Sequence, residues 1–201
     1  RVRGNDRIVV PLANGKVYLT NRRGESAKGF PLDLGMDITT QVFFEPGDRF
    51  DDSQFVTVSK DGLVGRFTMT GKMLSRNQLF KESSQSTFEL VQESQGKDFI
   101  FIRNDLGRLA ILTREGEVLF EKDYLATTDR TVQYYNFGAD RKLFVVKNNS
   151  TVYLYNQNGK LLNTKSLTSD FPVSIVYFSN DNICQIYLAH SNTIEIKRIN
   201  F

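Results

Sequence analysis

The feature that most constrains the fold of this chain is a short hairpin that recurs along it. In each copy a turn residue opens an apolar strand, and a glycine closes the turn that ends the strand. The copies run from Gly15 to Gly24, Gly62 to Gly71, Gly107 to Gly116 and Ser150 to Gly159, and a fifth opens at Asn192. The opening and closing positions are nine residues apart in each complete copy, whereas the openings recur after 47, 45, 43 and 42 residues. A constant hairpin joined by variable connections predicts a repeat architecture.

The glycines of the hairpin are expected at its turns because glycine adopts a positive φ without a Cβ clash. We therefore assign a structural turn role to seven of them: Gly15, Gly24, Gly62, Gly71, Gly107, Gly116 and Gly159. In the fourth copy the opening turn contains Asn148 and Asn149, and asparagine serves the same purpose.

Further strands surround each hairpin, and the third repeat shows them best. Residues 87–92 and 98–103 are candidate strands separated by a turn at Gln95-Gly96, and a further short strand at 117–120 follows the closing glycine. Short outer strands are likewise expected at 72–74 and 160–162. Four short strands in about 45 residues, separated by turn signals, predict a four-stranded antiparallel β-propeller blade. The chain is therefore expected to be all-β; a β-sandwich shares the strand number but does not explain the period.

The repeats predict about 4.5 blades in one propeller domain or fragment spanning residues 1–201. The expected blades cover approximately 1–36, 37–82, 83–126, 127–169 and 170–201. The first repeat lacks the inner strand and the fifth lacks the outer one, so the chain reads as part of a larger propeller, with a distorted five-blade ring as the alternative. An open stack of blades exposes an apolar flank at each end, which predicts self-association or coverage by another chain.

Composition narrows the classes of function. The formal charge is +3 with basic and acidic residues interspersed, which argues against a nucleic-acid partner. The single cysteine, Cys184, excludes an internal disulfide and cysteine-based metal clusters, and we expect it to be a packed small side chain. No apolar run approaches the roughly 18 residues of a membrane span. No cofactor is predicted.

Residues 14–25 and 28–32 resemble blades of bacterial WD40-like (YVTN-type) and quinoprotein-like propellers. The Trp-Asp pair, the kelch Gly-Gly doublet and the quinone-docking tryptophan of such families are missing from the sequence. The resemblance implies the propeller architecture and an extracytoplasmic or cell-envelope location in a bacterium. It implies no particular activity.

Three groups of residues are candidate sites. Asp48, Asp51 and Asp52 lie in the longest loop inside a repeat and are weak candidates for Ca²⁺, with a solvated acidic loop as the default. His190, the only histidine, precedes a turn and is expected at the surface. Tyr134 and Tyr135 lie on an expected inner strand and are candidates for a channel lining that binds a ligand or partner, although packing between blades is the preferred interpretation.

These features favour a non-catalytic propeller scaffold that mediates protein–protein interaction, and no catalytic residue is assigned. The alternative is a small-ligand, carbohydrate-binding or enzymatic propeller whose site is shared with blades outside this chain. Convergent polar and acidic side chains at the channel mouth would favour the alternative.

Overall fold

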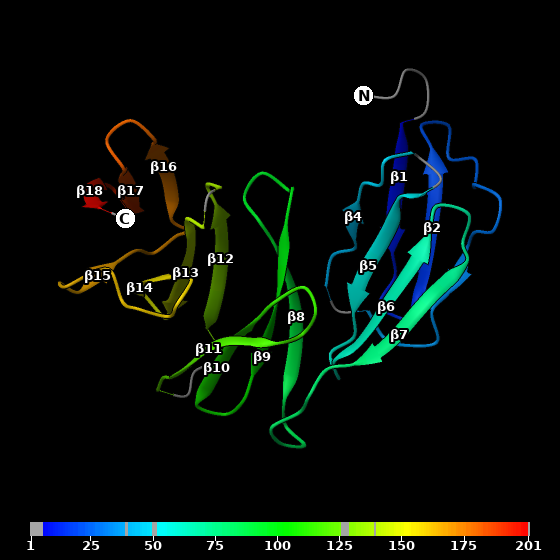
Figure 1. The fold of residues 1–201 in the computed structure, drawn as a ribbon, viewed down its shortest axis with the longest axis horizontal. Coiled ribbons are helices and arrows are strands. Elements are labelled where there is room, and N and C mark those ends of the chain that lie inside the picture. Colours follow the sequence, from blue (N-terminus) through cyan, green and yellow to red (C-terminus); the bar gives the residue numbers. More distant parts are fainter. Residues whose placement is uncertain (1–5, 39, 50–51, 126–128, 139, 201) are drawn as a thin grey trace. The chain divides into compact units, whose positions relative to one another are not determined.

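The computed structural model describes residues 6–38, 40–49, 52–125, 129–138 and 140–200. These residues form 18 strands in five antiparallel sheets of three or four strands (Figure 1). Each sheet is a meander in which strands that follow one another in sequence are neighbours. The order of three, four, four, four and three strands agrees with the order that the repeat predicts. Within the described residues, no helix is long and apolar enough to cross a membrane.

The sheets are numbered here in chain order. Sheet 1 contains β1 (Arg7–Pro11), β2 (Lys16–Asn21) and β3 (Leu32–Asp33). Sheet 2 contains β4 (Phe43–Glu45), β5 (Gln54–Val58), β6 (Leu63–Thr68) and β7 (Met73–Gln78). Sheet 3 contains β8 (Thr87–Gln92), β9 (Phe99–Asn104), β10 (Arg108–Leu112) and β11 (Val118–Asp123). Sheet 4 contains β12 (Arg130–Asn136), β13 (Lys142–Asn148), β14 (Thr151–Asn156) and β15 (Leu167–Thr168), and sheet 5 contains β16 (Ser174–Phe178), β17 (Ile183–Ala189) and β18 (Ile194–Asn200).

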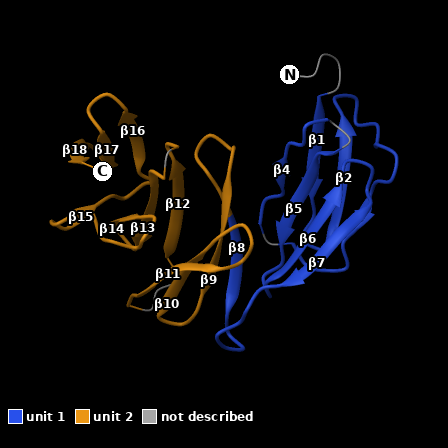
Figure 2. Ribbon diagram, in the orientation of Figure 1, with its two compact units in different colours: residues 1–90 blue, residues 91–201 orange. Residues whose placement is uncertain are grey.

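The chain divides into two compact units, residues 1–90 and 91–201, with the boundary inside β8 (Figure 2). The core of the first unit includes a cluster in which aromatic rings of sheet 2 meet aliphatic residues of sheet 1. Phe55 and Phe67 have ring centroids 5.3 Å apart, and Phe30 lies 6.5 Å from Phe67. Val17 and Leu19 of β2 belong to the same buried cluster.

Two hydrophobic clusters of the second unit lie on the two faces of sheet 4. Phe144 and Val146 belong to a cluster shared with sheet 3, whereas Leu143 and Val145 belong to one shared with sheet 5. Successive side chains of a strand point to opposite faces, so this division is what a sheet between two neighbouring sheets requires. It also explains why four consecutive residues of β13 are apolar and buried.

The turn glycines behave as predicted at six of the seven positions. Gly15, Gly24, Gly62, Gly71, Gly116 and Gly159 all have φ between 72° and 91°. At Gly15 an added Cβ would lie 2.2 Å from the carbonyl oxygen of Met36, so space as well as φ requires glycine. Asn149 replaces glycine with φ 53°, as expected.

Gly107 is the exception, because its φ lies outside the left-handed region. Its hairpin is tighter than those at Gly15 and Gly62: Asp105 donates its backbone N–H to the Arg108 carbonyl at 2.9 Å and accepts one from Arg108 at 3.3 Å. Only Leu106 and Gly107 remain between these paired residues. The positive φ expected for Gly107 was wrong: two residues separate the paired ends here, whereas three separate them at the Gly15 and Gly62 openings.

The outer strand of the fourth repeat also differs from the prediction. Residues 160–162 contribute only an isolated bridge between Leu161 and Tyr155, and the outer strand β15 lies later in the sequence. The side chain of Asn163 accepts a hydrogen bond from the Leu154 backbone N–H at 2.9 Å. An asparagine side chain thus takes the place of a strand partner at this position.

Candidate functional site

The candidate site is a cleft of about 1060 Å³ in the second unit. Its lining comes from the β8–β9 turn, the β10–β11 turn, the end of β12 with the following turn, and β16. The lining residues are Glu93, Ser94, Gln95, Lys97, Asp98, Arg114, Asn136, Phe137, Gly138, Lys142, Ile175, Val176, Tyr177 and Ser179. In a meander, the first and third turns lie at the same end of the sheet. The cleft is therefore formed by equivalent ends of sheets 3, 4 and 5.

Two glycine turns shape the walls of this cleft. Gly96 has φ 70° and donates its backbone N–H to Glu93 at 2.8 Å; Gly138 has φ 78° and accepts one from Arg141 at 2.9 Å. Each turn lets the chain reverse within a few residues, which places the polar residues that flank it beside the opening.

Glu93 holds the first turn in place. Its side chain is buried and accepts hydrogen bonds from the Ser94 hydroxyl at 2.7 Å and the Gln95 backbone N–H at 2.8 Å. The Ser94 backbone N–H donates to the Tyr134 carbonyl at 3.0 Å, so the turn is tied to β12 of the next sheet. The carboxylate of Glu93 therefore stabilises the turn from within.

The Asp98 carboxylate accepts hydrogen bonds from residues of the neighbouring sheet 4. One of its oxygens accepts from the Tyr134 hydroxyl at 2.6 Å and from the Asn136 side-chain amide at 3.1 Å. The other accepts from the Phe99 backbone N–H at 2.9 Å and lies 3.7 Å from the Arg114 guanidinium. Burial, the bond to Asp98 and the charge of Asp98 raise the pKa of Tyr134, which keeps its hydroxyl a donor to this carboxylate.

Tyr135 joins sheets 4 and 5. Its hydroxyl donates to the Val173 carbonyl at 2.5 Å, and Gln133 accepts from the Val173 backbone N–H at 2.8 Å. Burial, together with the nearby charge of Glu93, raises the pKa of Tyr135 to about 12. Tyr134 and Tyr135, which were candidates for binding a ligand or partner, are both buried packing residues that connect sheets. Their neighbour Asn136, in contrast, lines the cleft.

Cationic and aromatic side chains make up the rest of the cleft lining. Lys97 is exposed, whereas Arg114 and Lys142 are half-buried. The Arg114 guanidinium lies 5.0 Å from the centroid of the Phe99 ring. Phe137 and Tyr177 stack with their centroids 4.9 Å apart. The cleft thus offers positive charge beside an aromatic surface.

The other predicted site residues lie elsewhere. His190 begins the β17–β18 turn, where its backbone N–H donates to the Thr193 carbonyl at 2.9 Å, at the end of β17 opposite the β16–β17 turn. Asp52 pairs with Arg49 at 3.0 Å and Asp48 is exposed, whereas Asp51 lies outside the described residues. Throughout the described ranges, no three histidine, cysteine or acidic residues form a group that could hold a metal ion.

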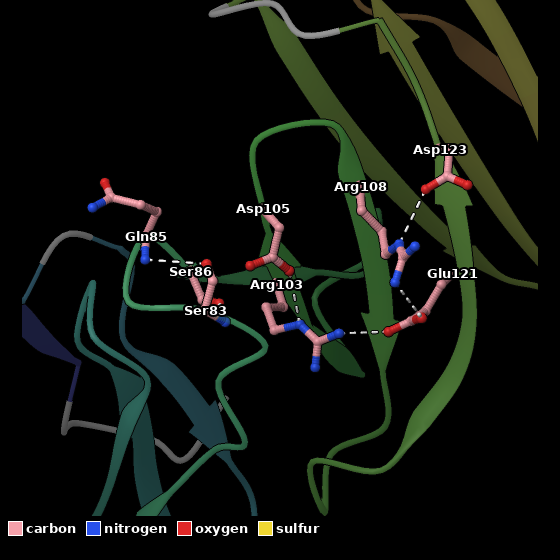
Figure 3. A network of polar contacts seen from close by, with 8 residues as sticks. All are labelled: Ser83, Gln85, Ser86, Arg103, Asp105, Arg108, Glu121 and Asp123. Carbon is pink, nitrogen blue, oxygen red and sulfur yellow. Dashed lines mark hydrogen bonds and ion pairs between the residues drawn. The ribbon is translucent and has the colours of Figure 1, made fainter.

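A second polar cluster surrounds Arg103 in sheet 3. Its side chain is 1% exposed and contacts Asp105 at 3.1 Å and Glu121 at 2.5 Å. Arg108 extends the cluster to Asp123 at 3.0 Å. Figure 3 shows these five side chains, together with the turn at Ser83–Ser86, in which the Gln85 backbone N–H donates to the Ser83 hydroxyl at 3.1 Å. A buried charge surrounded by partners from its own sheet is best explained as structural.

Sequence reasoning did not select Glu93, Asp98, Arg114, Phe137 or Tyr177. The signal was nevertheless present, because the turns at Gln95-Gly96 and Gly138 were recognisable. Equivalent turns of successive blades lie on one face, so polar and aromatic residues flanking them are natural candidates for a shared site.

No protein-family model and no curated protein matches this chain. Solved structures do match, at a level that shows the fold alone. BBS1N, in a crystal structure in complex with ARL6DN, has a TM-score of 0.56 and 17% identity, over 96% of this chain and 60% of BBS1N. BamB from Moraxella catarrhalis has a TM-score of 0.54 and 16% identity, over 97% of this chain and 54% of BamB. A protein of unknown function from Bacteroides caccae has a TM-score of 0.52 and 16% identity, over 96% of this chain and 72% of that chain.

Five sheets of three or four antiparallel strands that match the propellers BamB and BBS1N confirm the predicted all-β fold of propeller blades. This chain spans about 54 to 60% of the length of those two structures.

Proposed function

We propose that this chain is a non-catalytic scaffold that binds a segment of a partner protein in the cleft of its second unit. The observation that carries the proposal is the lining of the cleft. Turns of sheets 3 and 4 supply hydrogen-bonding and charged groups, and Phe137 and Tyr177 supply a stacked aromatic surface. The acidic side chains that would favour a ligand-binding site, Glu93 and Asp98, accept hydrogen bonds from within the protein. Aromatic residues and arginine beside polar groups are enriched where proteins bind one another.

Internal bonding of the cleft supports the same proposal. Glu93 and Asp98 tie the β8–β9 turn to its own backbone and to β12, so the walls are held in place before any partner arrives. A preorganised surface loses less conformational entropy when it binds. The structure of BBS1N in complex with ARL6DN shows that a related propeller fold can carry a protein partner, and it supports the proposal by analogy of fold only.

Selection from a library of displayed random peptides tests this proposal. We expect peptides to be enriched on the chain, and hydrogen–deuterium exchange should show that they protect residues 94–98 and 137–142. Protection confined to other segments, or no enrichment at all, would contradict a peptide-binding cleft. Protection of the same segments by oligosaccharides, without enrichment of peptides, would favour the carbohydrate-binding alternative.

The proposal includes self-association through the outermost sheet of the second unit. Ile186 and Leu188 of sheet 5 are buried against sheet 4, whereas Phe178, Ile194 and Ile196 on the opposite face are 43%, 69% and 51% exposed. Tyr187 pairs with Ile196 in the ladder and belongs to the same face. We call these four side chains the open face. Since the covered face already packs on a sheet of the same kind, a second copy can supply equivalent apolar packing.

Other parts of the sequence-based interpretation stay proposals. The five blade ranges of a single domain, 1–36, 37–82, 83–126, 127–169 and 170–201, are proposed on the period of the repeat. A WD40-like or quinoprotein-like repeat type rests on the sequence resemblance. A bacterial cell-envelope location rests on that resemblance alone.

A further inference from the structure

We propose that the segment bound in the cleft is acidic, with aspartate or glutamate side chains beside an apolar or aromatic residue. This inference rests on the proposed function and names the chemistry of the partner. The inference follows from the charged groups of the cleft. Its acidic side chains already accept hydrogen bonds from within the protein, and its basic side chains line the same cleft.

Both acidic residues of the cleft are occupied by internal donors. Glu93 accepts from a hydroxyl and a backbone N–H, and it is 4% exposed. Asp98 accepts from the Tyr134 hydroxyl, the Asn136 amide and a backbone N–H. A carboxylate has about four acceptor positions, so these bonds consume most of the acceptor capacity that the two residues could offer a ligand.

The basic residues are arranged differently. In the part of the chain that the structure describes, Lys97 and Lys142 form no ion pair, and both line the cleft. Arg114 is held over the Phe99 ring and lies 3.7 Å from Asp98, which positions its guanidinium at the same opening. Three cations from sheets 3 and 4 therefore surround one cleft, and carboxylates are the protein groups that complement them.

The expectation of an apolar or aromatic side chain in the bound segment comes from the rest of the cleft lining. Ile175, Val176 and Tyr177 contribute to its lining from β16, and Phe137 stacks on Tyr177. An apolar or aromatic side chain placed between flanking carboxylates would contact this surface while the carboxylates approach the cations. Such a segment would contact both the cationic and the apolar residues of the cleft lining.

An acidic peptide fits the cleft better than a nucleic acid. The whole chain carries a formal charge of only +3, and the carboxylates of Glu93 and Asp98 lie among the three cations. Nucleic-acid binding depends on a basic surface extended enough to neutralise several phosphates along the backbone. A peptide with a few carboxylates needs a smaller basic surface.

The test uses an array of random-sequence peptides in which each member is present in an acidic form and as its amide counterpart, with Asp replaced by Asn and Glu by Gln. We expect the 201-residue chain to favour acidic members by about tenfold, with a preference that decreases as ionic strength rises. The double variant Lys97→Glu with Lys142→Glu should lose this preference. The matched control is Lys28→Glu with Lys72→Glu, which reverses two exposed lysines of the first unit and should retain it.

The possible results separate this inference from the function on which it rests. Equal binding of acidic and amide peptides, with protection of residues 94–98 and 137–142, overturns the acidic preference and leaves the proposed function standing. Peptide binding without protection of those segments overturns both. Binding of single-stranded oligonucleotides that competes with the peptides and is lost in the Lys97→Glu, Lys142→Glu variant overturns the choice of partner class. If that variant does not fold, Lys97→Gln with Lys142→Gln removes the charges more mildly and should reduce the preference in the same direction.

Discussion

Sheets 4 and 5 are neighbours in the second unit, yet their central strands are buried in different ways. In β13 the residues from Leu143 to Val146 are all buried, whereas β17 alternates between half-buried and buried residues along its length. Sheet 4 lies between two hydrophobic clusters, and sheet 5 contributes to one of them. The difference shows that burial along a central strand reports how many faces of its sheet are covered.

The comparison also identifies what is unusual about sheet 5. A sheet with one face in water commonly alternates apolar and polar residues. Here the exposed side of sheet 5 instead carries Phe178, Ile194 and Ile196. Gln185 and Arg198 lie on the same side, so the open face is an apolar patch within a mixed surface, and we propose that a second copy packs on this patch.

The largest expected effect is on folding stability. Phe144→Ala in β13 should lower the free energy of unfolding by about 3–5 kcal/mol, because it removes a fully buried ring that stacks on Tyr134 at 5.2 Å. Ile196→Ala on the open face should change it by no more than about 0.5 kcal/mol in the monomer. Urea unfolding at low protein concentration measures both values. Equal losses would mean that the open face is covered within a single chain.

The next effect concerns the buried groups that lie between the two sheets. Burial raises the pKa of the Cys184 thiol to about 12 from 9.0, and that of Tyr135 to about 12 from 10.0. Since the folded state holds these protons more tightly, their contribution to stability is complete below pH 9 and is lost as the pH rises to 12. Between its unfolded-state and its folded-state pKa, each group should lower the free energy of unfolding by about 1.4 kcal/mol per pH unit.

Unfolding measured between pH 8 and pH 12 tests this pH dependence, with Cys184→Ala and Tyr135→Phe as the informative variants. Each variant should have a shallower loss of stability above about pH 9 or 10 than the unsubstituted chain. Tyr135→Phe also removes the hydroxyl bonded to Val173, so its stability at pH 7 should fall by about 1 kcal/mol. Unchanged slopes in both variants would show that other groups control the alkaline transition.

A smaller effect is expected on association between copies. Replacing Ile194 with Lys and Ile196 with Glu should weaken self-association about tenfold or more, because two exposed apolar side chains are lost from the open face. Sedimentation equilibrium measures the dissociation constant. The Lys97→Glu, Lys142→Glu variant serves as the control, since its substitutions lie in the cleft, and it should associate like the unsubstituted chain. Association that persists in the isoleucine variant and disappears in the lysine variant would contradict this assignment.

The sequence predicts much of the fold because the repeat encodes it locally. The nine-residue spacing from Gly62 to Gly71 marks both ends of a strand, and positive φ at these glycines fixes where the chain turns. What it could not predict depends on contacts between strands. The outer strand β15 lies later than predicted, after a segment in which Asn163 bonds to the backbone of Leu154, and the Gly107 turn is tighter than those at Gly15 and Gly62.

The site was harder to predict for a physical reason. Tyr134 and Tyr135 are aromatic residues on an inner strand, and the sequence alone does not distinguish a channel lining from packing between sheets. The place of Asp98 in the site depends on hydrogen bonds from Tyr134 and Asn136, which are more than thirty residues away in the sequence. Such pairs become visible only when the register of neighbouring sheets is known.

The most direct test of the account is an NMR measurement with a spin-labelled acidic peptide chosen from the array. The central claim is that the partner segment binds in the cleft, whereas the open face packs against a second copy. The claim predicts that paramagnetic broadening affects first the backbone amides of residues 94–98 and 138–142. Broadening that begins at residues 194–198 of β18, with the turn residues unaffected, would contradict it.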